Sequence, residues 1–544
     1  MKKILSFILM AVLFLGCEEE KYPGADEFRP DKDKTEQTPE DDNGGSTEDP
    51  ENPEDPENPE DPENPTDPEN PTDPENPADP EQPENPETPE QPETPETPET
   101  PSSWDYSPVT TATFGHNGLT YMWDESVMPE ITISVSVSEW NRLLKLFDQN
   151  NNTKEYIYCD ITYKKGSETH QIEDAGIRLR GNTSRRRPEV GSDTHRTNNA
   201  DWQHCHFGVN LRKFVKDSNH EIKGIRKFNL KWFKDDPCYV RELFCYDLFR
   251  RAGIWTAAFD VYCRLWVHVE GDSKPAYYGV YEMIEPYDNK YVEKREQLFG
   301  SADGNLWKCS YDSHGPADLK DPNANMAEDN NRDDFTYELK ESEAGFESAK
   351  AQLQDFIKKV NGKGDESFYT WIKEVCDVEL LMRTYAVNVA VGMWDDMWNN
   401  GNNYYLYFNS SDLYDYKVFL IPYDYDNTLG TSNAYDPARQ DPYNWGDRGI
   451  LMERMMQFEE FRNIYRDELK RLVNPAYGLM NQAAATQRIL DWQSKIKNYI
   501  TNDTDEDMEI KDRPASWGRV GDYRLMSTSN NYFTVKAETI NKMQ

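Results

Sequence analysis

The chain has 544 residues and a formal net charge of −41 at pH 7, but that charge is spread unevenly. Residues 18–103 hold 32 acidic residues against four Lys and Arg, and 21 of the 34 prolines. Residues 104–544 hold 69 acidic and 54 basic residues, an ordinary balance for a folded region, and contain 64 of the 68 aromatic residues. With no basic stripe in that region, the sequence argues against nucleic acid as a partner.

The first residues have the features of an export signal. Lys2 and Lys3 precede the apolar run Ile4 to Leu15, which is too short to span a membrane as a mature helix. Gly16 and Cys17 follow, and this ending resembles a bacterial lipoprotein signal whose cysteine is lipid-modified after cleavage. We therefore expect 1–17 to be a lipoprotein signal peptide with a lipidated Cys17; simple secretion is the alternative.

The acidic residues directly after Cys17 bear on where the protein is anchored. Glu18, Glu19 and Glu20 resemble the signal that sends lipoproteins to the outside of the cell in Bacteroidetes-type bacteria. An acidic tail would begin in the same way without such a signal. We expect a lipid-anchored protein of the outer membrane, exposed at the cell surface and held to the membrane through its lipid alone.

A strict proline repeat dominates the segment that follows. From Pro50 to Pro101 a proline stands at every third position, 18 in all, separated by pairs such as Glu-Asn and Glu-Asp. Polyproline II has three residues per turn, so all prolines share one edge, and 52 residues reach on the order of 160 Å when extended. We expect 18–103 to be a disordered acidic polyproline linker that acts as a stalk; a low-complexity linker without a length requirement is the alternative.

Aromatic-rich or alternating segments predict a β-rich lobe over about 104–310. One helix, Tyr239 to Ala252, interrupts the strands and ends at Gly253, a typical helix terminator. The predicted strands are Ile131 to Val137, Tyr156 to Tyr163, Gly176 to Arg180, His206 to Leu211, Lys227 to Phe233, Val261 to Val269 and Tyr277 to Ile284.

Helical periodicity predicts a different lobe over about 340–544. Two short strands, Asn403 to Phe408 and Lys417 to Pro422, form a hairpin inside it. The fold class is therefore α+β, with a β-rich N-terminal lobe, a helical C-terminal lobe and a cleft between them. The predicted helices are Phe346 to Val360, Val378 to Val391, Leu451 to Leu472 and Ala483 to Tyr499.

The cysteines do not indicate a metal cluster. Seven remain after Cys17, an odd number with no C-x-x-C pair. The densest group of metal-ligand types is His204-Cys205-His206. Alternate residues of a strand point to opposite faces, so Cys205 would face away from both histidines, and an ordinary polar strand is the better interpretation.

Two carboxylate clusters flank the predicted hairpin. Asp395 and Asp396 close the helix before it, and several asparagines follow them; Asp424 and Asp426 come directly after its second strand. An acidic residue after a strand is usually a turn former. Together, however, the two clusters supply what magnesium-nucleotide chemistry needs, which is hard oxygen ligands for the ion and a separate carboxylate to orient the attacking hydroxyl.

A set of segments in fixed order resembles the CotH kinase family. The resemblance implies an atypical protein-kinase-like fold that transfers phosphate from ATP to protein Ser or Thr with Mg or Mn as the divalent metal. The segments are Gly176 to Ser184, Lys227 to Pro237 with Arg241 and Glu242, Tyr278 to Glu285, Gly304 to Lys308, Asn403 to Tyr407, and Ile421 to Asp426 with Gly430.

The resemblance assigns roles to the two carboxylate clusters. Asp424 matches the metal aspartate of kinase-like folds, with Asp426 and Asn403 as further metal ligands. Asp396 or Asp395 is the catalytic carboxylate that orients the acceptor hydroxyl. Asp396 paired with Asn403 is preferred. Asp395 paired with Asn400 keeps the kinase spacing D-x-x-x-x-N and stays open.

Nucleotide-binding residues are expected in the first lobe. Arg180 and Gly181 lie where a strand turns, and the glycine allows close backbone approach. Lys231 is expected to face the nucleotide, paired with Glu285 or Glu242; a solvent-exposed strand face is the alternative. Where relatives carry a lysine-rich strand after the Arg-Gly-Asn motif, this chain has the polar stretch 185–203, which puts one phosphate contact in doubt.

The sequence thus predicts a cell-surface lipoprotein with a kinase domain that acts on a protein substrate at the cell surface or in the periplasm. The alternative is a catalytically inactive binding or adhesion module of the same fold that recognises surface proteins or glycans, because aromatic residues interleaved with Asn and Asp also form sugar-binding surfaces.

Overall fold

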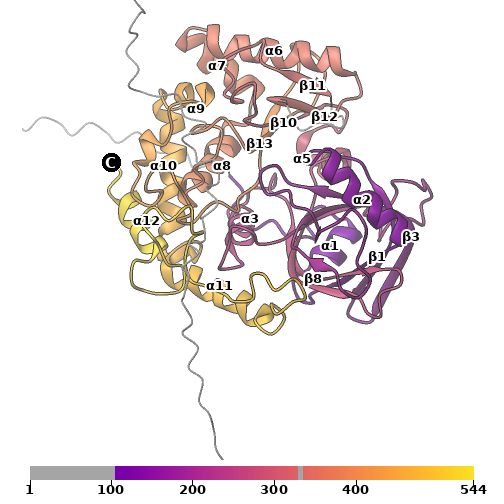
Figure 1. Ribbon diagram of the computed structural model, residues 1–544. Coiled ribbons are helices and arrows are strands. Elements are labelled where there is room, and N and C mark those ends of the chain that lie inside the picture. Colours follow the sequence, from indigo (N-terminus) through magenta and orange to yellow (C-terminus); the bar gives the residue numbers. More distant parts are fainter. Residues whose placement is uncertain (1–103, 329–334) are drawn as a thin grey trace, which may run out of the picture. The chain divides into compact units, whose positions relative to one another are not determined.

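Seven strands close into a barrel in the order β1-β2-β3-β6-β7-β9-β8 (Figure 1). The computed structural model describes residues 104–328 and 335–544. The expected signal peptide, Cys17 and the linker 18–103 lie outside this range. The barrel strands are β1 (Glu130–Val135), β2 (Ile157–Lys165), β3 (Glu168–Arg180), β6 (His206–Asn210), β7 (Lys227–Lys231), β8 (Asp260–Val269) and β9 (Ala276–Ile284).

The barrel follows from alternation in its strands. In β2, Ile157, Cys159, Ile161 and Tyr163 are buried while the residues between them are more exposed, as expected for a strand with one face in a core. The parallel pairing of β1 with β8 closes the barrel. Helix α1 (Asn117–Trp123), helix α2 (Val137–Gln149) and the small ladder of β4 (Glu189–Val190) and β5 (Asp201–Trp202) complete this region.

A second sheet has the order β11-β12-β10-β13-β14. It contains the predicted hairpin as β13 (Tyr404–Phe408) and β14 (Val418–Pro422). Strand β10 (Asn305–Cys309) pairs antiparallel with β13, so a strand from the end of the expected β-rich lobe belongs to the hairpin's sheet. The remaining strands are β11 (Met326–Glu328) and β12 (Tyr337–Glu341).

Helices dominate the second half. In α8 (Val378–Ala390) every residue from Leu380 to Ala390 is buried, and Asp377 caps its first turn by accepting a hydrogen bond from the Leu380 amide. The other helices are α4 (Asn289–Glu293), α5 (Glu296–Phe299), α6 (Phe346–Gly362), α7 (Asp365–Val375), α9 (Ile450–Met455), α10 (Glu459–Val473), α11 (Gln482–Ile496) and α12 (Tyr532–Asn541), with 3₁₀ turns η2 (Pro442–Asn444) and η3 (Pro475–Tyr477).

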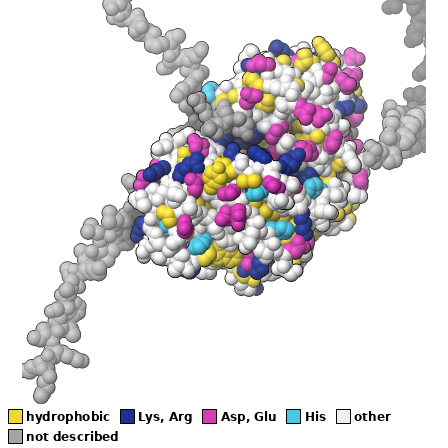
Figure 2. All heavy atoms as spheres, turned by 90° about the vertical axis from the view of Figure 1, so that its right-hand side faces the viewer, with side chains coloured by type: hydrophobic (Ala, Val, Ile, Leu, Met, Phe, Trp, Pro, Cys, Tyr) yellow, Lys and Arg dark blue, Asp and Glu magenta, His cyan; other side chains and the backbone are white. Residues whose placement is uncertain are grey.

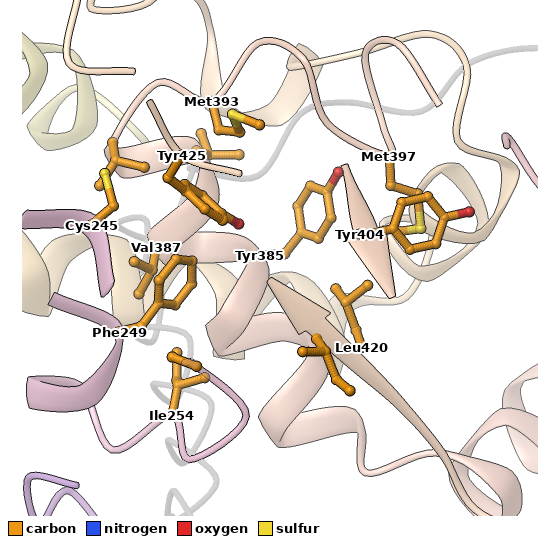
Figure 3. Packing of buried hydrophobic residues seen from close by; sticks show 14 of the residues in the cluster. Cys245, Phe249, Ile254, Tyr385, Val387, Met393, Met397, Tyr404, Leu420 and Tyr425 are labelled. Carbon is orange, nitrogen blue, oxygen red and sulfur yellow. The ribbon is translucent and has the colours of Figure 1, made fainter. Parts of the chain in front are cut away.

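Helix α3 (Arg241–Arg251) connects the barrel to a second hydrophobic core. It lies between β7 and β8 in the chain, but its apolar residues pack in the core formed by the second sheet and the helices. Figure 3 shows Cys245 and Phe249 of this helix beside Tyr425, and the Phe249 and Tyr425 rings are 5.0 Å apart. This packing holds the start of α3 against the chain that follows β14.

The observed elements confirm the predicted α+β class. Each predicted strand is present, with ends shifted by a few residues or, in β3, extended toward its start. The prediction of one continuous helix from Leu451 to Leu472 is wrong, because the helix is interrupted between α9 and α10. Phe458 at this break has an extended backbone, and its ring stacks on Phe368 and packs against Phe461.

Two further properties concern the described residues as a whole. All seven cysteines among them are buried and free of disulfides. Within 104–328 and 335–544, no helix combines the length and apolar character needed to cross a bilayer.

Candidate functional site

The ion pair of Lys231 and Glu242 marks the centre of the site. Lys231 is the last residue of β7, and Glu242 lies in the first turn of α3, the next helix along the chain. Their charged groups are in direct contact, and the side chains are 8% and 3% exposed. Of the two carboxylates predicted as partners of Lys231, Glu242 is therefore the one that contacts it.

The hairpin of β13 and β14 carries two more carboxylates to the same lysine. Lys231 Nζ lies 2.7 Å from Asp424 Oδ1 and 3.5 Å from Asp426 Oδ2. The Asp424 amide donates to the Tyr246 hydroxyl of α3 at 3.1 Å, and the Tyr425 amide donates to Glu242 at 3.3 Å. Backbone contacts thus lock this loop onto α3.

Two non-glycine residues at this end of the hairpin adopt positive φ. Tyr404 and Pro422 form the terminal pair of the β13–β14 ladder, and Asn403 and Asp424 lie just beyond it. Their φ angles are 54° and 65°. Asn and Asp adopt this left-handed conformation more readily than other side chains do. Both residues were singled out by the sequence.

The charges of the cluster depend strongly on one another. Burial opposes the charge on Lys231, but Asp424 and Glu242 together raise its pKa well above the usual range. Burial also disfavours the charge of Asp424, yet Lys231 lowers the pKa of that carboxyl below its usual value. Burial and repulsion by neighbouring carboxylates raise the pKa of Asp426. Lys231 therefore contacts three carboxylates, more than its single positive charge can neutralise.

The residues fit a divalent cation. Ligand oxygens of Glu242, Asp424 and Asp426 lie within 4.8 Å of one another. Hard carboxylate oxygens around an excess of negative charge suit Mg²⁺ or Mn²⁺. Asp424 and Asp426 were both predicted from sequence, whereas Glu242 was expected only as a partner of the lysine. Asn403 is the third predicted ligand, and its side-chain nitrogen Nδ2 donates a hydrogen bond to Asp395 at 3.0 Å.

Asp395 is surrounded by side-chain amides. It accepts hydrogen bonds from Asn400 at 2.6 Å, from Asn402 at 3.1 Å and from Asn403 at 3.0 Å. Burial raises the pKa of Asp395 despite these donors, and the negative charge of Asp424 adds to the effect. The charge of the carboxylate cluster therefore affects the pKa of Asp395. Among the described residues, Asp395 is held by side-chain amides and forms no salt bridge.

Asp396 has a different environment. Its carboxylate accepts hydrogen bonds from Tyr385 at 2.9 Å, from Trp445 at 3.2 Å and from the Asn399 amide at 2.7 Å, with Asn388 as a fourth donor. The side chain is buried, and burial raises its pKa to about 7 in spite of these donors. Asn403, which the sequence paired with Asp396, contacts Asp395 instead.

Arg180 and Gly181 lie at the end of β3, where the sequence placed them. Arg180 Nη2 is 3.4 Å from the hydroxyl of Tyr423, the residue before Asp424, and its charge contributes to the lowered pKa of Asp424. Gly181 has φ 107°, and a Cβ there would approach Ser184 Oγ to 2.6 Å and the Arg185 amide nitrogen to 3.0 Å. The turn beside Arg180 therefore requires glycine.

Glu285 does not join the cluster. It lies just past the end of β9, paired bidentately with the buried Arg295 at 2.7 and 3.1 Å, and Lys294 lies 3.2 Å away. These cations lower the pKa of Glu285 although burial opposes this. The prediction of Glu285 as a lysine partner is wrong because two local cations compete for it.

Two residues near the cluster were missed. Glu282 of β9 stands opposite Lys231 in the strand pairing, and its Oε1 has no hydrogen-bond partner among the described residues. Burial and the charge of Glu242 raise its pKa well above the usual range. Lys308 of β10 lies 5.8 Å from the Tyr423 ring centroid and helps to lower the pKa of Asp424. Both lie within segments that carried the family resemblance, which was the available signal.

His204 and His206, which flank Cys205, pack against an aromatic ring next to Lys231. His204 and His206 lie near the ring of Trp232, with centroids 5.7 and 5.2 Å away. His206 Nδ1 accepts a hydrogen bond from the Trp232 amide, and burial together with Lys231 lowers its pKa well below the usual value. A neutral His206 holds the segment just after Lys231 in place.

Basic side chains are unevenly distributed on one face of the molecule. On the face drawn in Figure 2, Lys and Arg side chains gather in a band across the middle, and acidic side chains are frequent above it.

Comparison with known proteins is consistent with this geometry. A family model described as CotH kinase protein matches residues 177–534, about two thirds of the chain. The matched range includes Lys231, Glu242, Asp395 and Asp424. A search of curated proteins found no match.

Proposed function

The protein belongs to the CotH kinase family, and we propose that it transfers the γ-phosphoryl group of ATP to the hydroxyl group of Ser or Thr in a protein. The family implies the use of ATP and a divalent metal in general. The observation that carries the proposal is the convergence of Lys231, Glu242 and Asp424 from a strand, a helix and a hairpin.

Glu242, Asp424 and Asp426 would hold the divalent cation, which we propose to be Mg²⁺. When bound, the ion supplies positive charge that offsets the negative charge of the nucleotide phosphates. Lys231 is already positioned among these carboxylates. Once the ion neutralises the carboxylates, the lysine can contact phosphate oxygens. Arg180, near Asp424, adds a second cation on the same side.

Asp395 is the residue that we assign to the acceptor. Its carboxylate takes the proton of the Ser or Thr hydroxyl while the hydroxyl oxygen bonds to the γ-phosphorus. The bond from that phosphorus to the bridging oxygen breaks, and ADP leaves with the electron pair. The three asparagine amides fix the direction of the carboxylate, and its raised pKa suits proton transfer.

Asp396 positions the loop and takes no part in the chemistry. Its backbone carbonyl accepts hydrogen bonds from the Asn400 and Asn402 amides, so the turn that carries the amides around Asp395 is built on Asp396. The buried hydrogen bonds of its side chain anchor the turn to α8 and to Trp445.

The test is transfer of labelled γ-phosphate from ATP to a generic Ser- and Thr-containing acceptor protein in the presence of Mg²⁺. Wild-type protein should label the acceptor, and Asp395→Asn should lower the rate by about 10²- to 10⁴-fold. Exposed Asp415, in the turn at the other end of the hairpin, provides the control Asp415→Asn, which should keep full activity. Equal activity in wild type and Asp395→Asn would exclude this assignment of Asp395.

We also propose that the protein is anchored to the outer membrane through a lipid on Cys17 and displayed at the cell surface. The support is the signal-like segment that ends at Cys17 and the acidic residues after it. Cys17→Ala should release the protein from the membrane fraction, and added protease should digest the wild-type protein on intact cells. A membrane-bound Cys17→Ala protein would rule out the lipid anchor.

A further inference from the structure

A cavity of about 200 Å³ lies at the end of β7 away from Lys231. Lys227, the first residue of the strand, lines it, and Lys231 is the last residue. At about 3.3 Å per residue, the backbones of Lys227 and Lys231 are about 13 Å apart along the strand. Six cationic side chains line it: Arg212, Lys216, Arg226, Lys227, Lys290 and Lys294.

The carboxylates of the cavity are already engaged. Asp288 pairs with Lys227 at 2.8 Å and also accepts hydrogen bonds from the backbone amides of Lys290 and Tyr291. Glu285 is held by the buried Arg295 and by Lys294. Asp288 and Glu285 are therefore both occupied by the cations with which they already pair.

The cations exceed these acids. Arg212 and Arg226 share a single carboxylate, Glu221, at 3.4 and 3.2 Å. Lys216 is exposed and makes no ion pair with a carboxylate of the described residues within 4 Å. Lys290 pairs with Glu293. The six lining cations therefore still outnumber the carboxylates that pair with them, and the lining carries excess positive charge.

We propose that this cavity binds a phosphoryl group carried on a Ser or Thr side chain of a protein partner. Arginine forks and lysine ammonium groups are the donors that recognise phosphate oxygens. Pockets for drug-sized ligands measure about 300–1,000 Å³, so a cavity of about 200 Å³ suits a single phosphoryl group better than a whole nucleotide.

The inference rests on the proposed function in one respect, because the partner we assign is a substrate that already carries one phosphate. A phosphoryl group held here, at the other end of the strand that carries Lys231, would favour transfer to further hydroxyl groups of the same protein. The cavity itself is separate from the transfer site, so its binding can be measured without any catalytic activity.

The experiment measures binding of a fluorescent phosphoserine peptide to the full-length protein without nucleotide or metal, by anisotropy at about 150 mM salt. The pocket variant is Lys216→Gln with Arg226→Gln. The control is Lys213→Gln, an exposed lysine of the same loop that does not line the cavity. Unmodified peptide, and inorganic phosphate as competitor, complete the set.

We expect the phosphoserine peptide to bind at least tenfold more tightly than the unmodified peptide, the pocket variant to remove this difference, and Lys213→Gln to keep it. If inorganic phosphate at low concentration displaces the phosphoserine peptide, the ligand of the cavity is free phosphate. That result would overturn the assignment of a phosphorylated protein as the partner. Lys231→Met serves as the second variant. Loss of binding in Lys231→Met with retention in the pocket variant would place the phosphate in the catalytic cluster and overturn the proposal, as would equal binding of both peptides.

Discussion

Lys231 Nζ lies 2.7 Å from Asp424 Oδ1 although 193 residues separate the two along the chain. The contact joins the last residue of a barrel strand to the loop after the β13–β14 hairpin. Because Glu242 and Asp426 also contact this lysine, its ammonium group stands where a divalent cation would compensate the same carboxylates. Lysine and metal therefore compete electrostatically in the absence of nucleotide.

Replacement of the lysine tests this competition. Lys231→Met should bind Mn²⁺ at least about tenfold more tightly than wild type in the absence of nucleotide, because three carboxylates lose their cation. The same variant should lose phosphate transfer. Titration calorimetry with Mn²⁺ measures the affinity, and Lys213→Met is the control on the barrel surface. An unchanged Mn²⁺ affinity would show that the lysine does not compete with the metal.

The neighbouring aspartates should respond differently to loss of charge. Asp395→Asn should abolish most transfer while thermal unfolding stays close to wild type. Asp396→Asn should destabilise the fold by about 1–3 kcal/mol, because an amide NH₂ would replace one of two oxygens that accept four hydrogen bonds in a buried site. Thermal unfolding and transfer rates measured on both variants check the pair. A destabilised Asp395→Asn with an undisturbed Asp396→Asn would reverse the assignment.

The turn at Gly181 offers a matched pair of glycine variants. Gly181→Ala places a Cβ against Ser184 and the Arg185 amide at φ 107°. Gly191→Ala has nearly the same backbone angle, φ 111°, with no atom within 4 Å. Each should cost of order 1–3 kcal/mol in stability. Only Gly181→Ala should raise the KM for ATP, since Arg180 moves with the turn. Equal KM values would remove this turn from the nucleotide site.

A buried lysine gives a stability dependence on pH. Burial lowers the pKa of Lys536 from 10.5 to about 7, while the charge of Asp436 partly opposes the shift. Between pH 7 and 10.5 the unfolded chain keeps this proton and the folded protein has released it. The contribution of Lys536 to the free energy of unfolding therefore rises with pH in this window, by up to about 1.4 kcal/mol per unit.

Lys536→Met should remove that rise. Urea unfolding at pH 6, 7, 8 and 9 should show that wild type gains stability relative to the variant above pH 7. The loss of the hydrogen bond from Lys536 to the Pro437 carbonyl adds an offset that does not vary with pH. A constant difference between the two proteins at all four values would contradict the assigned pKa.

Sequence patterns were enough for the strands of the barrel and for the residues of the hairpin, but not for every helix, since α2 and α7 were not predicted and α9 and α10 were predicted as one. Alternation in β2 and in β7 predicts strands because one face of each is buried, and Asp424 was placed at the end of β14. The pairing of β10 with β13 could not be predicted, because nothing in either segment specifies a partner about 100 residues away.

The roles within the two carboxylate pairs also required the structure. Asp395 and Asp396 are adjacent, and the sequence favoured Asp396 through its pairing with Asn403, but in the fold Asp396 contacts Tyr385 and Asp395 lies beside the asparagines. Glu242 and Glu285 were equal candidates for Lys231 until Arg295 proved to be the partner of Glu285. Both assignments depend on contacts between side chains that the sequence pattern does not specify.

The central claim is that Lys231, Glu242 and Asp424 form a metal-nucleotide site. The most direct measurement is thermal unfolding of wild type, Asp424→Asn and Asp415→Asn with and without Mg²⁺ and ATP together. At 100 times the dissociation constant, a ligand that binds only the folded state adds about 2.7 kcal/mol. We predict a raised melting temperature for wild type and Asp415→Asn and none for Asp424→Asn. An unchanged melting temperature in all three, or an equal rise in all three, would contradict the site.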